Sequence, residues 1–297
     1  MSEVSFQELM KHAESKNYAV GYFESWNMDS MLAVGDAAEK LRSPVIIGFG
    51  GLFLTNKNRV VKDSLSIFAK LAKEVCRSIC VPACTLFNES NNFESVLTSI
   101  DHGYNIVMFV DSSLSFNDLV EKVSEIVKKA HENSVAVEAE LDELPGLESL
   151  TGLRRNSSLT DPENAERFVS LTGIDALSIN IGQSHKQGKE IELDFERLKK
   201  IKEKTNIPLV LHGVSNLKIV DIDRSVDLGV RKFNLGRVLK QAYFDKLRSE
   251  IENVKEGYSI YEIMGSGFKN DILVKARFEV QKIVERFMKL YRSAGKA

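Results

Sequence analysis

Two histidines stand where apolar segments end. His212 follows the run Leu209 to Leu211, and His185 closes the segment from Asp175 to His185. Unbroken apolar runs are typical of strands covered on both faces in a parallel sheet. Imidazole is the commonest metal ligand of this kind, so two of the chain's five histidines at neighbouring strand ends predict one shared metal site. The alternative is a pair of structural histidines with satisfied hydrogen bonds.

Carboxylates occupy related positions on two other predicted strands. One strand ends in Asn88-Glu89, which places Glu89 where the other strands have histidine. Glu138 and Glu140 belong to another strand and point to the same side of it, because side chains alternate between the two faces. Metal-ligating or acid/base chemistry is therefore expected at several strand ends together.

Eight apolar strand signals alternate with helix signals, which predicts a (β/α)8 barrel. A single barrel domain of residues 1–297, with extra N- and C-terminal helices, agrees with the usual barrel length of about 250 residues. The strands are expected at 18–23, 43–49, 79–87, 104–111, 134–140, from 175, 207–211 and 230–235. The helices are expected at 5–16, 28–41, 63–77, 93–102, 116–133, from Thr160-Asp-Pro-Glu163, 194–204, from Gly236-Arg237, and 271–291.

A barrel of this kind binds its ligands at the carboxyl ends of its strands. The amides of Gly213 and Ser215, just after His212, are suited to hold an anion at a helix start. The segments 141–159 and 186–190 have no clear period and are expected to be lid or binding loops.

Composition excludes several classes of protein. The formal net charge is −2, from 40 basic and 42 acidic residues, which gives no sign of a nucleic-acid surface. No stretch approaches the about 18 consecutive apolar residues of a membrane span, and the first residues lack the pattern of a signal peptide. We therefore expect a cytoplasmic protein that does not bind membranes.

Three cysteines, at positions 76, 80 and 84, fall in one short segment. Their spacing matches no zinc motif, so reduced core thiols are favoured over a metal knuckle. Cys76 and Cys80 are expected to share a helix face, and Cys84 to lie in the following strand.

Along nearly its whole length the sequence resembles the class II (metal-dependent) fructose-bisphosphate aldolases and their tagatose-bisphosphate relatives. The order and spacing of several short motifs carry the resemblance. These are Ala19 to Phe23 with Asn27, Ser43 to Ile46, Val137 to Leu141, Thr160 to Glu163, Gly182 to His185, Leu211 to Ser215, Lys232 to Asn234 and the terminal Ser293 to Ala297.

The resemblance implies a divalent metal, usually zinc, held by three histidines. The metal polarises the ketose carbonyl and stabilises the enediolate left after carbon–carbon cleavage. His185 and His212 match two of these ligands, and Glu89 takes the place of the third. Two histidines and a carboxylate still form a metal site, one better suited to manganese or iron than three histidines are. Glu140 matches a carboxylate at or near the metal.

The resemblance also assigns acid/base residues. Asn88 replaces the family's catalytic aspartate, and an amide can position a hydroxyl without exchanging its proton. Glu148 matches the acid of the mobile loop, which exchanges the proton at the enediolate carbon. Its alternative reading is a solvated loop residue.

At the phosphate end, Gly182, Gly213, Ser215 and Asn234 agree with the family, whereas Lys186 and Arg237 depart from it by adding positive charge. Arg237 could bind a phosphate, sulfonate or carboxylate in a fork, or could be an ordinary surface residue.

The expected partner is thus a small phosphorylated sugar, and the resemblance favours a homodimer or homotetramer. The leading function is aldol cleavage or condensation of a phosphorylated ketose. An isomerase or epimerase acting through the same enediolate, and a non-catalytic sugar-phosphate-binding barrel, are the alternatives.

Overall fold

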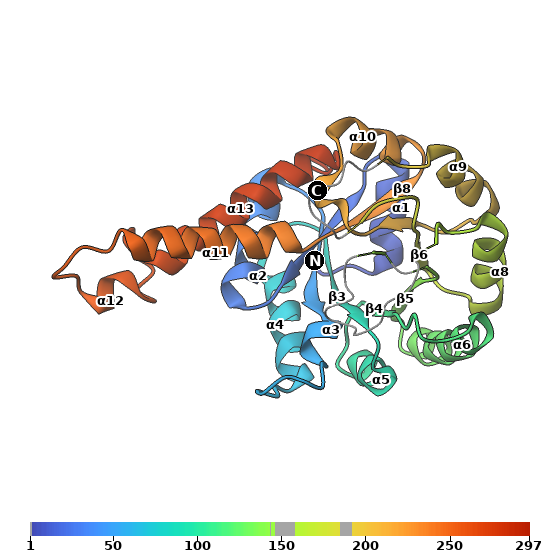
Figure 1. Cartoon of the computed structure of the whole chain (residues 1–297), viewed down its shortest axis with the longest axis horizontal. Coiled ribbons are helices and arrows are strands. Elements are labelled where there is room, and N and C mark those ends of the chain that lie inside the picture. The colour runs from blue at the N-terminus through green and yellow to red at the C-terminus, as the bar shows by residue number, and fades with distance from the viewer. Residues whose placement is uncertain (1, 143, 146–157, 185–191) are drawn as a thin grey trace.

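In the computed structural model, which describes residues 2–142, 144–145, 158–184 and 192–297, eight parallel strands close into a barrel (Figure 1). Each strand pairs with its neighbours in chain order, and β8 pairs with β1. This confirms the predicted (β/α)8 fold. The strands are β1 (Val20–Ser25), β2 (Val45–Gly50), β3 (Ala83–Ser90), β4 (Ile106–Phe109), β5 (Ala136–Glu140), β6 (Ala176–Ser178), β7 (Leu209–Leu211) and β8 (Val230–Leu235).

Helices surround the barrel in the order expected for alternating β and α units. They are α1 (Phe6–Ser15), α2 (Met28–Leu41), α3 (Gly51–Leu54), α4 (Leu65–Ser78), α5 (Phe93–Asp101), α6 (Phe116–Glu132), α8 (Pro162–Thr172), α9 (Phe195–Lys204), α10 (Ile219–Asp227), α11 (Arg237–Glu252), α12 (Ile260–Ile263) and α13 (Ile272–Leu290), with a short 3-10 turn at Val214–Asn216.

Side-chain alternation divides the barrel into an outer core beneath the helices and an inner core within the strands. The inner core is apolar at its amino-terminal end, where Phe6 and Met10 of α1 pack with inward residues such as Val20 and Ile46. Toward the carboxyl ends the inward positions become polar, as at Asn88. The sequence thus places its polar chemistry at one end of an otherwise apolar barrel.

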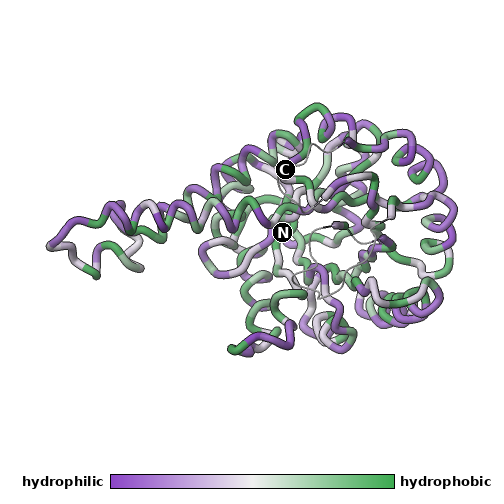
Figure 2. Tube along the Cα trace, in the orientation of Figure 1, coloured by the Kyte–Doolittle hydropathy of each residue, from purple (hydrophilic) through white to green (hydrophobic). Residues whose placement is uncertain are grey.

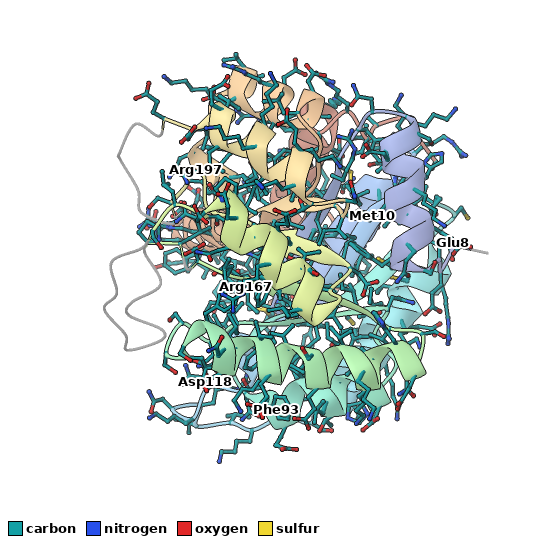
Figure 3. All side chains as sticks on the ribbon, turned by 90° about the vertical axis from the view of Figure 1, so that its right-hand side faces the viewer. Glu8, Met10, Phe93, Asp118, Arg167 and Arg197 are labelled. Atoms are coloured by element: carbon teal, nitrogen blue, oxygen red, sulfur yellow. The ribbon has the colours of Figure 1, made fainter. Side chains whose placement is uncertain are left out.

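The outer helices pack side by side, as α6, α8 and α9 do on the flank in Figure 3. Asp161 caps α8 by accepting a hydrogen bond from the Asn164 amide, with Pro162 in the first turn, as predicted. Arg167 of α8 lies 4.9 Å from the ring centre of Phe116 at the start of α6.

Helices α11 and α13 continue beyond the barrel as an antiparallel hairpin, with α12 near its tip (Figure 1). Hydrophobic and hydrophilic stretches alternate along this arm (Figure 2). We call residues 244–278 the arm. Its apolar side chains Phe244, Tyr261 and Phe268 are exposed.

The structure corrects several local predictions. Helix α10 and the short helices α3 and α12 were not expected, and most strands are shorter than their apolar runs. Helix α4 ends at Ser78, so Cys80 shares no helix face with Cys76 and is exposed, while Cys76 and Cys84 are buried free thiols. The description of Cys80 as a core thiol was therefore wrong. Among the described residues, no helix combines the length and apolar character needed to cross a membrane.

A substitution at Gly48 tests how closely β2 and β3 must approach each other. A Cβ at this position would lie 1.8 Å from the Leu86 carbonyl oxygen, which is backbone and cannot move aside easily. Gly48→Ala is expected to lower the free energy of unfolding by about 3 kcal/mol, measured by denaturant titration. The matched control is Gly35→Ala in α2, where the added methyl meets only Val75 and Ile79 side chains at 3.3 Å. Equal stability for both variants would show that the β2–β3 contact is not tight.

Candidate active site at the barrel mouth

A cavity of about 560 Å³ opens at the carboxyl ends of the strands. It is bounded by β1, β3, β7 and β8 and by the first turns of α11. The polar residues that face it include Tyr22, Glu24, Asn88, Glu89, His212 and Asn234. Its volume is within the range of sites for small molecules, about 300–1,000 Å³.

His212 follows β7 and is only 1% exposed, with a carboxylate at each ring nitrogen. Its Nδ1 lies 2.5 Å from Glu89 Oε1, and its Nε2 lies 2.9 Å from Glu138 Oε1. Burial disfavours the protonated ring, yet the hydrogen bonds with Glu138 and Glu89 outweigh it and raise the pKa of His212 to about 9. The imidazole is thus fixed in orientation from both sides.

Glu138 is completely buried on β5, where its second oxygen lies 2.8 Å from the Lys232 ammonium of β8. Burial alone would raise the pKa of Glu138, but the Lys232 charge and the hydrogen bond with His212 lower it below its usual value. Burial also lowers the pKa of Lys232, against the opposing effect of Glu138. A buried ion pair therefore stands directly behind the imidazole.

Glu89 reaches the mouth through an irregular backbone. Its φ is 44°, in the left-handed region that residues other than glycine seldom adopt. The ladder between β3 and β4 shifts register between Phe87 and Ser90, around the same residue. Departures of this kind often occur at functional sites, because a bulge can redirect a side chain. Here the redirected carboxylate meets His212.

Asn88 and Asn234 complete the polar layer beside His212. The Asn234 amide donates a hydrogen bond to Asn88 Oδ1 at 3.1 Å, and Lys232 donates to Asn234 Oδ1 at 2.5 Å. Both asparagines are almost fully buried and face the cavity. They can orient a ligand hydroxyl, but neither titrates near neutral pH.

Glu140, the next inward residue of β5, accepts a hydrogen bond from Ser178 of β6 at 3.1 Å. Glu138 and Glu140 are separated by one residue on the strand, as predicted, and Glu138 contacts the histidine. Asp142 and Ser158 form a further hydrogen bond at 2.7 Å beyond this strand end.

A smaller cavity of about 110 Å³ adjoins the first beside Gly213, Ser215 and Arg237. Gly213 has a φ of 65°, which a glycine adopts without strain, and it precedes the short 3-10 turn containing Ser215. Arg237 is the first residue of α11, as predicted. Gly182, with a φ of 118°, donates its amide hydrogen to Asn180 and lines neither cavity.

The comparisons with known proteins agree with this fold. The sequence profile described as "Fructose-bisphosphate aldolase class-II" matches residues 4–296. The chain belongs to the class II fructose-bisphosphate aldolase family. Its predicted membership is thereby confirmed.

Relatives of this class II aldolase-family protein span the whole fold. The uncharacterized protein YdjI of Escherichia coli K12 is 34% identical over 235 residues, which cover 77% of this chain and 81% of YdjI. The crystal structure described as the YdjI aldolase matches with a TM-score of 0.81 and 28% identity over 99% of both chains. The fructose-bisphosphate aldolase of Campylobacter jejuni shares the fold, with a TM-score of 0.77 and 21% identity over 100% of this chain and 97% of that one.

The structure brings together some of the predicted site residues of this family member. Glu89 contacts His212, and Asn88, Asn234, Gly213, Ser215 and Arg237 line the adjoining cavities. His185, Lys186 and Glu148 lie outside the described residues, so their predicted roles stay predictions. Over the described parts of the chain, no group of three His, Cys, Asp or Glu side chains is arranged to hold a metal ion.

The two described donors nevertheless fit a divalent cation. Glu89 and His212 both line the cavity, with Oε1 and Nδ1 in contact, and they would offer one oxygen and one nitrogen ligand. Glu138 bonds the opposite ring nitrogen, the arrangement by which carboxylates commonly orient metal-binding histidines.

Lys232, Glu24 and Lys240 were not assigned to this site from sequence, and Glu138 was placed on its strand without a partner. Glu24, at the end of β1, pairs with Lys240 of α11 at the cavity wall. Burial raises the pKa of Glu24, and Lys240 opposes that effect. The alternation of side chains along β5 and β8 could have indicated that Glu138 and Lys232 point inward. It could not have indicated which residues they contact.

Breaking the internal ion pair tests its role in this class II aldolase-family protein. Lys232→Met is expected to cost about 3 kcal/mol of unfolding free energy, because it leaves the Glu138 carboxylate buried without its cation. The double variant Lys232→Met with Glu138→Gln is expected to recover most of that loss. Denaturant titration of metal-free protein measures both, and an equal loss in both variants would contradict the proposed coupling.

Proposed function

We propose that this protein is a metal-dependent aldehyde-lyase that cleaves or forms a carbon–carbon bond in a phosphorylated ketose through an enediolate. Family membership supports an aldolase, and the contact between Glu89 and His212 at the cavity supports a metal-dependent one. The metal, the substrate and the individual residue roles are the proposed parts.

Glu89, His185 and His212 would hold the metal, with Glu140 as a further carboxylate near it. A bound divalent cation would polarise the ketose carbonyl and stabilise the negative charge that develops on its oxygen. The family favours zinc, while the carboxylate at position 89 also suits manganese or iron.

The chain's own residues would orient the substrate around that centre. Glu138 bonds Nε2 of the His212 ring and thereby holds Nδ1 against Glu89. The Asn88 amide can position a substrate hydroxyl but cannot remove its proton, and Glu148 is the proposed acid/base for the carbon-bound proton.

The adjoining smaller cavity is the proposed phosphate site. Gly213 and Ser215 lie where backbone amides can face an anion, and Arg237 borders the same space with a guanidinium group. Gly182, Lys186 and Asn234 are proposed to contribute to ligand binding from the neighbouring strand ends.

One observation favours a second candidate, an isomerase or epimerase of sugar phosphates. The position of the family's catalytic aspartate is occupied by Asn88, whose side-chain oxygen accepts a hydrogen bond from Asn234. An enediolate isomerisation needs proton transfer beside a carbonyl but does not require an acid at this position. Unbroken rearranged sugar would identify this reaction, and cleavage fragments would identify the lyase.

The metal-dependent enediolate step is tested with dihydroxyacetone phosphate in deuterated water. Protein loaded with manganese or zinc is expected to bind one ion per chain and to exchange a carbon-bound substrate proton, followed by NMR. Glu89→Ala is expected to lose metal and to slow exchange at least about 100-fold, because a ligand is removed. Glu125→Gln, an exposed change on α6, is the matched acidic control and should retain both.

A wild-type protein that binds no metal and exchanges no proton would contradict the lyase proposal. Tight binding of sugar phosphates without turnover across a broad panel would instead support the non-catalytic barrel.

We also propose that the protein forms a homodimer or homotetramer through its arm. Tyr261 is 86% exposed and Phe268 is 63% exposed, and the arm projects away from its own barrel, which therefore cannot cover them (Figure 1). Val60 and Val61, between α3 and α4, are a further exposed apolar pair. In a two-fold symmetric dimer, the arm of each copy could pack against Val60 and Val61 of the other copy. Both apolar patches would then be buried in each copy.

Light scattering after size-exclusion chromatography tests this assembly. Tyr261→Glu with Phe268→Glu is expected to raise the monomer fraction at least about tenfold, because two charges would be buried at the interface. Lys255→Glu, which changes the net charge equally at another exposed arm position, should leave the oligomer intact. A monomeric wild type, or identical behaviour of both variants, would contradict the proposed interface.

A further inference from the structure

Tyr22 belongs to the wall of the mouth cavity, although its motif suggested only an apolar strand. It lies on β1, directly paired in register with Asn234 of β8. Its side chain is inward-facing and 1% exposed, within the inner core that includes Val20 and Leu86. The ring therefore borders both the apolar interior and the polar cavity.

The Tyr22 hydroxyl is buried and has no hydrogen-bond partner among the described residues. Tyr104 and Tyr291 have hydroxyls in the same condition, but neither residue lines the cavity. Their rings pack in the outer core, Tyr104 with Phe87 and Tyr291 with Phe233. A buried donor without an acceptor is unfavourable, so Tyr22 calls for a partner that enters the cavity.

The surroundings of Tyr22 determine what its hydroxyl can do. Burial is the main cause that raises its pKa well above the usual value, and the carboxylates of Glu24 and Glu89 raise it further. The Lys232 ammonium lies 5.4 Å from the ring centre, behind the Glu138 pair. Tyr22 is therefore a neutral phenol at physiological pH, able to donate a hydrogen bond but unsuited to act as a base.

We propose that the Tyr22 hydroxyl donates a hydrogen bond to the substrate oxygen that becomes negatively charged in the enediolate, which makes Tyr22 a catalytic residue. The inference rests on the proposed function and extends it to a residue outside the predicted set. No proton is transferred from Tyr22 in this role. The donor stabilises developing charge from a fixed position, as donors of an oxyanion hole do.

The position of Asn88 strengthens the inference. Asn88 lines the same cavity, and its side-chain oxygen is already occupied by the Asn234 amide. A ligand seated between Asn88 and Glu89 has the Tyr22 ring as part of the same wall. The Tyr22 hydroxyl is thus an uncharged donor in the same cavity as Asn88, which replaces the family's acid.

The variant Tyr22→Phe removes only the hydroxyl, and Tyr104→Phe is its matched control. Because neither hydroxyl has a partner, both variants are expected to unfold at or above the wild-type temperature. Tyr22→Phe is expected to bind metal normally but to exchange the carbon-bound proton of dihydroxyacetone phosphate about 100-fold more slowly, mainly through kcat. Tyr104→Phe should exchange at the wild-type rate.

Wild-type exchange by Tyr22→Phe would overturn the inference while leaving the proposed function intact. A melting temperature well below that of Tyr104→Phe would also overturn it, because the hydroxyl would then have a structural partner. If the wild type does not exchange protons, the proposed function fails separately. Calorimetry with dihydroxyacetone phosphate then decides, since weaker binding by Tyr22→Phe supports a ligand contact, whereas equal binding or no binding by either protein overturns it.

Discussion

The carboxylate of Glu138 is the interaction on which the arrangement of the mouth depends. One of its oxygens faces the Lys232 ammonium and the other faces Nε2 of His212, all inside the barrel and almost without solvent. A buried charge is tolerated only when it is paired and hydrogen-bonded, and here each partner restricts the other. The result is a histidine whose outer nitrogen has one available direction, toward Glu89.

The orientation of His212 Nδ1 toward Glu89 accounts for the irregular backbone at Glu89. A left-handed residue in a strand is unfavourable by roughly 1–3 kcal/mol and persists where the surrounding fold enforces it. Strict alternation after the inward Asn88 would point Glu89 outward, but the register shift between Phe87 and Ser90 lets its carboxylate turn toward the histidine. An apolar barrel therefore supports a polar mouth, in which a fixed nitrogen and a redirected oxygen converge beside a cavity.

The (β/α)8 architecture could be predicted from sequence alone. Each of the eight apolar runs, and each helix signal between them, depends only on local pattern. Helix α2 begins at Met28 and ends at Leu41, as its periodicity predicted, and Asp161 caps α8. Local pattern also placed Glu138 on the same side of its strand as Glu140. It could not reveal Lys232 as its partner, since which inward residues meet depends on the stagger between β5 and β8 across the barrel. The same dependence on tertiary arrangement explains why Tyr22 was not identified from sequence as a residue of the cavity.

Glu138 holds the His212 ring through Nε2, so that Nδ1 lies beside Glu89 and could bind a metal ion. A crystal structure of protein grown with manganese, with anomalous scattering to locate the ion, tests it most directly. We predict one ion bonded to Nδ1 of His212 and to a carboxylate oxygen of Glu89, with Glu138 still hydrogen-bonded to Nε2. An ion bonded to Nε2, or Glu89 turned away from the ion, would contradict it.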